Sequence, residues 1–300
     1  MTPSSRLALI ALFPLSLAAA ESGPAGDALV FDPAPKVANG ADAPGEGSDQ
    51  GQIWFGKRIL VDTWGVVSAP AGWDGRDWLI AGGAVAATVA TGLWLDQPAQ
   101  GDSQEDRSAG KDRWSGAWGE LGTIYSFVAL GVAGTYGWIA DDERGVNAMI
   151  DGLEASVIAS GIICPALKFI VGRSRPQQAA QDSDQFQPFS GNNSFPSGHA
   201  TQAFTVATVV ACTFDDQPLL GGAAFALATG VGLSRINDNA HYASDVVAGA
   251  ILGTWVGYEI VHFNRRRRGE EVARARGIAD AQLDLILDHD RQGVSFTWHW

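Results

Sequence analysis

The feature that most restricts the fold is a series of long apolar segments between residues 78 and 265. Each segment is too long for a strand, and none alternates apolar and polar residues with the period of two that a half-buried strand shows. The connections between the segments are rich in Asp, Gly, Pro and Gln, as loops are. We therefore expect an all-α fold, a six-helix bundle, with helices over residues 78–95, 118–140, 146–171, 198–214, 219–233 and 240–265.

The N-terminal part of the chain differs from these helices. Residues 1–20 have the pattern of a signal peptide, in which a positive charge precedes an apolar stretch and three alanines form a small-residue cleavage site. Residues 21–50 are rich in Gly, Ala, Pro and Asp and predict a disordered acidic leader. Residues 51–268 would form the folded domain, which begins with short helices or loops over residues 53–78.

Residues 269–300 are expected to be a C-terminal extension. The pattern is polar and predicts helix up to His289, and residues 294–300 then alternate apolar and polar side chains. This alternation predicts a short strand-like tail. Inside the domain, Pro165 predicts a kink in the third helix, because proline removes a backbone donor and its ring obstructs the preceding turn.

The charge and the cysteine content exclude several classes of function. A net charge of −13 argues against a nucleic-acid partner, so a basic site that binds an anion must be local. Cys164 and Cys212 lie in apolar runs and are expected to be buried thiols. Because the five histidines form no cluster with cysteines, we expect neither a metal site nor a cofactor.

Two blocks of residues could bind an anion between the third and fourth helices. Lys168 and Arg175 are seven residues apart, which places them on one helix face, and Pro176 then turns the chain away. Ser197 stands at the N-cap of the fourth helix, with Gly198 and His199 in its first turn. A helix N-terminus attracts anions. Taken alone, the first block is more simply explained as a solvated basic pair and the second as an ordinary capped helix.

A third block follows before the sixth helix. Ser234-Arg235 is followed after five residues by His241 and after three more by Asp245. His241 and Asp245 are four residues apart, so the carboxylate can fix the tautomer of the imidazole. Arg235 could hold a phosphate with two hydrogen bonds. A purely structural His–Asp pair is the alternative.

Taken in this order, the three blocks resemble the signature of the type 2 phosphatidic acid phosphatase (PAP2) superfamily: K-x6-R-P, P-S-G-H and S-R-x5-H-x3-D. That superfamily also includes bacterial class A acid phosphatases and vanadium haloperoxidases. The motifs cover residues 168–245, and the helical pattern extends the resemblance to about residues 78–265. The resemblance implies the helical fold of that superfamily.

The resemblance also implies a role for each matching residue. His241 would be the nucleophile that forms a phosphohistidine, and Asp245 would orient it. His199 would protonate the leaving oxygen and then activate water. The phosphate oxygens would be held by Lys168, Arg175, Ser197, Gly198 and Arg235.

The expected function is therefore a metal-independent phosphatase for phosphomonoesters or diphosphates, with lipids as the first class of substrate. A soluble-substrate acid phosphatase and a phosphotransferase are the alternatives within the superfamily. The same residues would also suit a vanadium haloperoxidase or a non-catalytic phosphate-binding protein. The expected partners are a phosphorylated lipid or small molecule and a membrane surface.

The location can be interpreted in two ways. If residues 1–20 are cleaved and six helices span, the motifs would face the cytoplasm, whereas the basic run Arg265–Arg268 at the opposite end favours the cytoplasm for that end. Because these cues conflict, we expect a bundle exported whole to the periplasm, soluble or membrane-associated. A six-span membrane protein is the alternative.

Several residues near the motifs have simpler expected roles. Arg173 is expected to be solvated, with a further phosphate ligand as the alternative. The tryptophans near the N-terminal part are expected to pack in the core, with insertion into a membrane surface as the alternative. Asn237 and Asp238 are expected to form a turn or to gate the site. The loop between the first two blocks is expected to be a polar surface loop or to cover the pocket; its polar residues are Asp182, Asp184, Asn192 and Asn193.

Overall fold

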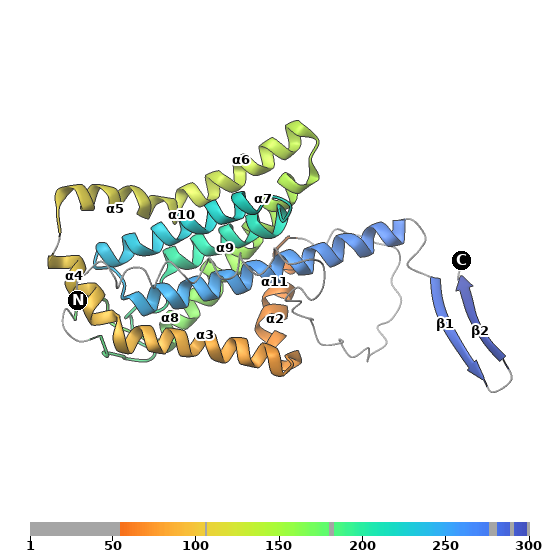
Figure 1. Cartoon of the computed structure of the whole chain (residues 1–300), viewed down its shortest axis with the longest axis horizontal. Helices are drawn as coiled ribbons and strands as arrows, with labels where there is room; N and C mark the ends of the chain where they lie inside the picture. Colours follow the sequence, from red (N-terminus) through yellow and green to blue (C-terminus); the bar gives the residue numbers. More distant parts are fainter. Residues whose placement is uncertain (1–54, 106, 180–182, 276–280, 289–290, 299–300) are drawn as a thin grey trace. The chain divides into compact units, whose positions relative to one another are not determined.

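The structure is a computed structural model, and it describes residues 55–105, 107–179, 183–275, 281–288 and 291–298 (Figure 1). The chain divides into two compact units, Met1–Ile260 and Val261–Trp300. The signal peptide and the acidic leader that we expect over residues 1–50 lie outside the described residues. The domain boundary expected after residue 268 stays a prediction.

The described part of the chain is mainly helical, as the sequence predicts. Its α-helices, labelled in Figure 1, are α2 (Phe55–Ser68), α3 (Gly75–Trp94), α4 (Asp96–Glu105), α5 (Ala109–Leu121), α6 (Ile124–Ala140), α7 (Glu143–Ser156), α8 (Cys164–Val171), α9 (Gly198–Thr213), α10 (Pro218–Asn237) and α11 (Ala243–Ala275). A 3-10 turn (Ala69–Gly72) follows α2, and a π-helix (Val157–Ile163) joins α7 to α8. The expected all-α class is confirmed.

The segment between the first two expected helices contains the largest correction. We expect a connection there, but α4 and α5 occupy most of it. The Ser108 side chain caps α5 by accepting from the Lys111 backbone N–H at 3.3 Å. Both helices pack on α10, and Ser115 and Gly119 of α5 are buried. This packing supplies the stability that the polar sequence itself does not indicate.

The third expected helix is present, but its middle is not an ordinary α-helix. The π-helix Val157–Ile163 lies immediately before Pro165, which stands in the first turn of α8. Proline lacks the N–H that would continue the α-helical ladder, and its ring would clash with the carbonyl four residues earlier. The wider turns of the π-helix avoid this clash, and the expected kink stays a prediction.

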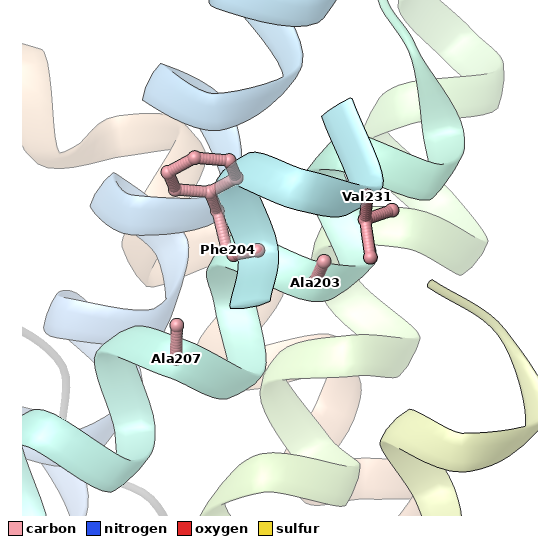
Figure 2. Packing of buried hydrophobic residues seen from close by; sticks show 5 residues of the cluster. Ala203, Phe204, Ala207 and Val231 are labelled. Atoms are coloured by element: carbon pink, nitrogen blue, oxygen red, sulfur yellow. The ribbon is translucent and has the colours of Figure 1, made fainter. Parts of the chain in front are cut away.

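The centre of the first unit lies where α9 meets α10. Its core cluster is formed by Ala203, Phe204, Ala207, Ala228 and Val231, and Figure 2 shows these side chains. On its other side α9 meets α11 through Gly249, Gly253 and Gly257, where an added Cβ would overlap or crowd the α9 backbone. The small residues allow the two helices to approach closely. The starts of α9 and α11 are therefore held together.

The C-terminal residues differ from the expected helix. Strand β1 (Ala281–Asp288) pairs antiparallel with β2 (Arg291–Trp298), with Ala281 opposite Trp298. The prediction of a strand-like tail is confirmed for residues 294–298, whereas the helix predicted up to His289 ends at Ala275 in α11. Polarity alone did not reveal β1, whose partner strand supplies its backbone hydrogen bonds.

Four described helical segments are long and apolar enough to cross a membrane: Gly75–Trp94, Glu143–Val171, Pro218–Asn237 and Ala243–Gly269. The bent pair of α5 and α6 would bring the number to five. Only 6% of the apolar window in Gly75–Trp94 is buried inside the protein, so most of this helix presents apolar side chains outward. These helices suggest association with a membrane.

The tryptophans support the same interpretation and correct a prediction. We expect them to pack in the core, but four of them are between 56% and 79% exposed: Trp64, Trp78, Trp94 and Trp138. Trp73 does pack, edge to face, against Trp255 at a ring distance of 5.9 Å. Tryptophan is enriched at membrane interfaces, where an amphipathic ring is favoured.

Candidate active site

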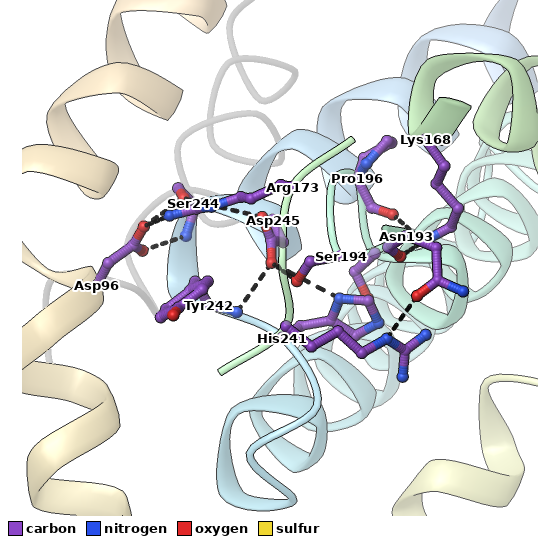
Figure 3. Close-up of polar contacts among 12 residues, drawn as sticks. Asp96, Lys168, Arg173, Asn193, Ser194, Pro196, His241, Tyr242, Ser244 and Asp245 are labelled. Carbon is purple, nitrogen blue, oxygen red and sulfur yellow. Dashed lines mark hydrogen bonds and ion pairs between the residues drawn. The ribbon is translucent and has the colours of Figure 1, made fainter. Parts of the chain in front are cut away.

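The three sequence blocks meet at one end of the helices of the first unit. Lys168 lies in the last turn of α8, Ser197 caps the start of α9, and Asp245 lies in the first turn of α11. The Ser197 backbone N–H donates to the Asp245 carbonyl at 2.9 Å. The Lys168 ammonium donates to the Pro196 carbonyl at 2.7 Å, which fixes α8 against the start of α9 (Figure 3).

Asn193 holds the first two cations in place. Its backbone carbonyl accepts from the Lys168 ammonium at 2.6 Å, and its side-chain oxygen accepts from Arg175 Nε at 2.8 Å. The hydrogen bond to Nε leaves the outer edge of the Arg175 guanidinium available for an anion. Asn193 is exposed, as expected for a surface loop, but it also positions two residues of the predicted phosphate site.

Arg235, the third cation, is enclosed by α5. It forms an ion pair with Asp238, and the Ser115 hydroxyl of α5 donates to the same carboxylate. At Gly119 an added Cβ would overlap the Arg235 guanidinium, so a side chain at that position would displace the arginine. Asp238 was expected to form a turn or to gate the site. In the structure its carboxylate forms an ion pair with Arg235 and helps to hold that side chain in place.

The start of α9 provides a buried hydroxyl that is available to a ligand. Ser197 is completely buried, and within the described structure its hydroxyl has no hydrogen-bond partner. A buried hydroxyl without a partner is costly, and a bound oxyanion would satisfy it. An added Cβ on Gly198 would lie 3.9 Å from Cε of Lys168, so the Gly198 backbone adjoins the same cation.

His199, in the first turn of α9, is surrounded by positive charge. Burial, followed by the charges of Arg235, His241, Arg175 and Lys168 in this order of importance, lowers its pKa from 6.5 to about 4. The three cations and both histidines therefore lie within electrostatic reach of one another. His199 is therefore neutral near pH 7. An anion that offsets these charges raises the pKa of His199 and increases the protonated fraction, which can donate a proton.

His241 and Asp245 form the expected pair. His241 Nδ1 lies 3.7 Å from Asp245 Oδ2, which is longer than a hydrogen bond, and both side chains are buried. Burial lowers the pKa of His241, so its imidazole is neutral and can act as a nucleophile. The carboxylate of Asp245 is fixed on Oδ2 by the Ser194 hydroxyl at 2.6 Å and by the Tyr242 N–H at 3.0 Å.

The other carboxylate oxygen of Asp245, Oδ1, accepts a hydrogen bond from Arg173, for which the prediction from sequence was wrong. Arg173 is 3% exposed, whereas we expect it to be solvated. Its Nη1 donates to Asp245 Oδ1 at 2.7 Å, and its Nη2 donates to Asp96 Oδ2 at 2.7 Å (Figure 3). The guanidinium is stacked over the Tyr242 ring, 4.3 Å from its centroid.

The other Arg173 donors are also satisfied. Nη1 donates to the Ser244 hydroxyl at 2.7 Å, and the Ser183 carbonyl accepts from Nε at 3.0 Å and from Nη2 at 2.7 Å. Asp96 in turn accepts from the Ser244 N–H at 2.8 Å and from its hydroxyl at 2.6 Å. Arg173 therefore links α4, the loop at Ser183 and the start of α11.

Asp96 and Arg173 are the residues that sequence reasoning missed. Arg173 lies inside the K-x6-R-P block, two residues before Arg175, but its burial depends on partners from distant segments. Asp96 directly follows a long apolar helix, where a lone carboxylate usually lies in solvent. The structure brings together the eight predicted site residues, Lys168, Arg175, Ser197, Gly198, His199, Arg235, His241 and Asp245.

Cysteine and acidic side chains in the described part of the chain are candidate ligands for a metal site. Cys164 is buried, as predicted, whereas Cys212 is only partly buried. Within the residues that the structure describes, no group of three or more His, Cys, Asp or Glu side chains is arranged to hold a metal ion.

Comparison with known proteins gives partial matches to lipid phosphatases. The lipid A 1-phosphatase of Rhizobium johnstonii is 38% identical over 104 residues, which is 33% of this chain and 41% of that protein. The protein of the same name from Rhizobium etli is 37% identical over 107 residues, 34% of this chain and 45% of that one. The matched stretch thus spans less than half the length of these relatives.

Two solved structures are also similar. One is LpxE of Aquifex aeolicus, with 22% identity and a TM-score of 0.44 over 56% of this chain and 95% of that chain. The other is a transmembrane PAP2-type phosphatidylglycerolphosphate phosphatase from Bacillus subtilis, with 16% identity and a TM-score of 0.45 over 71% of this chain and 96% of that chain.

The family model described as the PAP2 superfamily matches residues 152–269. This segment contains all three motifs, from Lys168 to Asp245, and the described structure brings them to one place. Residues 152–269 therefore belong to the PAP2 superfamily.

Proposed function

We propose that the protein is a lipid phosphatase that removes a phosphate monoester through a phosphohistidine on His241. The observation that carries this proposal is the buried Ser197 hydroxyl, which has no partner in the described structure and lies at a helix N-terminus beside His199 and Lys168. A tetrahedral oxyanion supplies what this pocket lacks, because it accepts hydrogen bonds and neutralises the cations.

The proposed reaction has two steps. First, Nε2 of His241 attacks phosphorus, the bond from phosphorus to the ester oxygen breaks, and His199 gives its proton to the leaving oxygen. Second, His199 takes a proton from water, the water oxygen bonds to phosphorus, and the bond from phosphorus to His241 breaks. Lys168, Arg175 and Arg235 stabilise the charge on the phosphoryl oxygens in both steps.

Asp245 orients the nucleophile in this scheme. Its Oδ2 would accept from the Nδ1–H of His241, which leaves Nε2 unprotonated and able to attack. The present separation of 3.7 Å must shorten by less than 1 Å to make that hydrogen bond. Catalytic hydrogen bonds are often long in unliganded sites and tighten when substrate binds.

We propose a phosphorylated lipid as the substrate, with lipid A 1-phosphate as the first candidate. The relatives that match the motif segment are named lipid A 1-phosphatases. All four candidate membrane spans also have one end at the site. The spans Gly75–Trp94, Glu143–Val171 and Pro218–Asn237 end there, and Ala243–Gly269 begins there. A site at the ends of membrane spans lies level with lipid phosphate groups.

We further propose that the protein is integral to the membrane and that the site faces the periplasm. The last span begins at the site and ends at Arg265–Arg268, and arginines near a span favour the cytoplasmic side. Retention in the membrane after a carbonate wash is expected. This orientation places the start of Gly75–Trp94 in the cytoplasm, whereas cleavage of residues 1–20 as a signal peptide would place it in the periplasm, so N-terminal sequencing that starts near Glu21 would contradict the orientation.

A phosphate-release panel tests the activity. The purified protein is given lipid A, phosphatidic acid, phosphatidylglycerophosphate and a soluble phosphate ester, each with and without EDTA. We expect release from a lipid substrate that is unchanged by EDTA, and complete loss with EDTA would contradict metal independence. His241→Ala should abolish release, whereas the matched control His262→Ala should not.

The intermediate is tested separately. Wild-type protein mixed with a radiolabelled substrate and quenched in alkali should carry label on histidine, which is stable to base as phosphohistidine. His241→Ala should carry none. Label that persists in His241→Ala would contradict the assignment of the nucleophile.

A further inference from the structure

Beside the phosphate site, the structure holds a set of outward-facing apolar side chains that the proposed reaction does not use. They are Phe169 and Ile170, which follow Lys168 in α8, and Phe186 and Phe189 in the loop after Ser183. Their exposed fractions range from 48% to 67%. We call these four residues the apolar rim.

The loop that carries half of the rim is held firmly on the end of α8. The Ser174 N–H donates to the Gln185 carbonyl at 3.0 Å, and the Gln187 N–H donates to the Gly172 carbonyl at 2.8 Å. The Phe189 N–H donates to the Phe169 carbonyl at 2.7 Å. Gly172 has φ +59, and an added Cβ would overlap the Gln187 carbonyl, so the close contact requires glycine.

Phe189 is held in a conformation that is unfavourable for a bulky residue. Its φ is 61, in the left-handed region that residues other than Gly, Asn and Asp seldom adopt. In spite of this cost its side chain is 67% exposed, and its ring meets Phe169 edge to face at 5.6 Å. In water, both the backbone strain and the exposed apolar surface of Phe189 raise the free energy of the folded protein.

The position of the rim indicates what covers it. The candidate span Glu143–Val171 ends directly after Phe169 and Ile170, so these residues lie at the end of an apolar helix. The loop adds Phe186 and Phe189 beyond the end of that span. Phe186 also packs on the buried guanidinium of Arg173, at 5.3 Å, which connects the rim to the site.

We propose that the apolar rim inserts into the acyl-chain boundary of the lipid bilayer and keeps the phosphate site at the depth of lipid headgroups. This inference rests on the proposed lipid phosphatase activity and membrane location. Acyl chains would bury the exposed ring of Phe189, because apolar side chains at the boundary are covered by lipid. The free energy gained by this burial would offset the cost of the left-handed backbone conformation of Phe189.

The first test compares two substrates in a variant that leaves the pocket intact. Phe189→Ser combined with Ile170→Ser removes two exposed rim side chains and leaves every proposed catalytic residue in place. We expect activity on a long-chain lipid phosphate in vesicles to fall by about tenfold or more, since each apolar side chain contributes strongly to interfacial binding. Activity on a short-chain, monomeric lipid phosphate should stay within about twofold. Gln187→Ser, an exposed polar position in the same loop, is the matched control.

Equal losses on both substrates would overturn the inference, because they would assign the rim to the pocket itself. Unchanged activity on vesicles would overturn it as well. The soluble substrate also reports whether the variant is folded, since a misfolded variant would lose both activities.

The second test does not depend on enzymatic activity. A nitroxide is attached to Phe189→Cys or to Gln187→Cys in a Cys212→Ser background, in substrate-free phosphatidylcholine vesicles; Cys164 is buried. At position 189 we expect greater accessibility to oxygen than to a water-soluble nickel complex, and at position 187 the reverse. Aqueous accessibility at 189 overturns the inference even if the protein hydrolyses lipid phosphates. Bilayer burial at 189 without any phosphatase activity supports the rim and refutes the proposed function.

Discussion

Arg173 donates a hydrogen bond of 2.7 Å to the carboxylate of Asp245, and both side chains are buried. Asp245 in turn faces the imidazole of His241, so the arginine determines where the carboxylate can lie. In the described structure the Arg173 side chain donates to Asp96, Ser183, Ser244 and Asp245, none of which is a predicted phosphate-binding residue. We therefore regard it as a positioning residue, held from the other side by Asp96.

Replacing this arginine should lower the rate without weakening substrate binding. In Arg173→Gln the carboxylate of Asp245 loses its charged partner and shifts, and a displacement of about 1 Å costs about 100-fold in rate. We expect kcat to fall by this order while KM changes little, because Lys168, Arg175 and Arg235 are unaltered. Kinetics on a soluble phosphate ester measure both constants.

Asp96→Asn gives a second measurement of the same network. The amide keeps the shape but removes one of the two charges that hold Arg173, so the loss of kcat should be smaller than in Arg173→Gln. Arg76→Gln, an exposed arginine in the first turn of the preceding helix, α3, is the control. A rise in KM with unchanged kcat would show that Arg173 acts on substrate binding instead.

Two glycines of α5 provide a matched pair of substitutions. At Gly119 an added Cβ overlaps the Arg235 guanidinium, whereas at Gly116, one turn earlier, it meets no atom within 4 Å. Gly119→Ala should displace Arg235 and lower kcat/KM by about 10- to 100-fold, as expected when a charged phosphate ligand is misplaced. Gly116→Ala should keep full activity and stabilise the helix by about 0.5–1 kcal/mol. Equal kinetics of the two variants would show that α5 does not constrain Arg235.

The regions that the sequence predicts well are those in which the local pattern decides the structure. The helix expected over residues 198–214 is α9, Gly198–Thr213, because Ser197 marks its start and no glycine, proline, aspartate or glutamate interrupts the mainly apolar residues that follow Gly198 up to Thr213. The motif residues were also found from sequence, since their chemistry depends on residue type and spacing. Their convergence required the fold, and α9 and α11 achieve it through the glycines of α11.

The regions that could not be predicted depend on partners far away in the chain. Arg173 is buried because Asp96 and Asp245, 77 and 72 residues away, neutralise it. Nothing next to Arg173 in the sequence indicates either carboxylate. Helices α4 and α5 were missed for a related reason, since they are polar and are stabilised by packing on α10 rather than by an apolar pattern of their own.

His199 should take up a proton when an anion binds. In the unliganded pocket its pKa is about 4 instead of 6.5, owing to burial and then to the nearby cations. A bound oxyanion offsets those cations and raises the pKa, so the bound state holds more protons than the free state above about pH 4. Affinity for the anion should therefore increase as the pH falls from 6.5 towards about 4.

Sulfate is a suitable probe for this effect, because its own charge does not change in that range. Calorimetry in buffers of different ionisation enthalpy counts the protons taken up on binding. We expect uptake in the wild type and none in His199→Gln. The same uptake in both proteins would assign the proton to another group.

Far from the motifs along α7, Arg58 of α2 and Glu154 of α7 form a bidentate ion pair, with hydrogen bonds of 3.1 and 2.6 Å. Glu154 is fully buried, so the pair fastens α2 to the bundle. Removing one partner from a buried pair is strongly destabilising, by about 3–5 kcal/mol. Arg58→Ala should therefore lower the Tm markedly, while kcat and KM of the folded protein stay unchanged, because α2 contributes no residue to the site.

A double variant separates this explanation from a simple loss of packing. Replacing both partners, as in Arg58→Met with Glu154→Leu, removes the buried charge of Glu154 together with its counter-ion and keeps most of the volume, while Asp62 and Asp151, each 3.9 Å from Arg58, lose only a more distant partner. The Tm should then recover towards the wild-type value, since an apolar pair avoids the desolvation of two charges. Thermal unfolding in detergent gives both values. A double variant that is less stable than Arg58→Ala would show that Glu154 stabilises the bundle through its other neighbours rather than through Arg58.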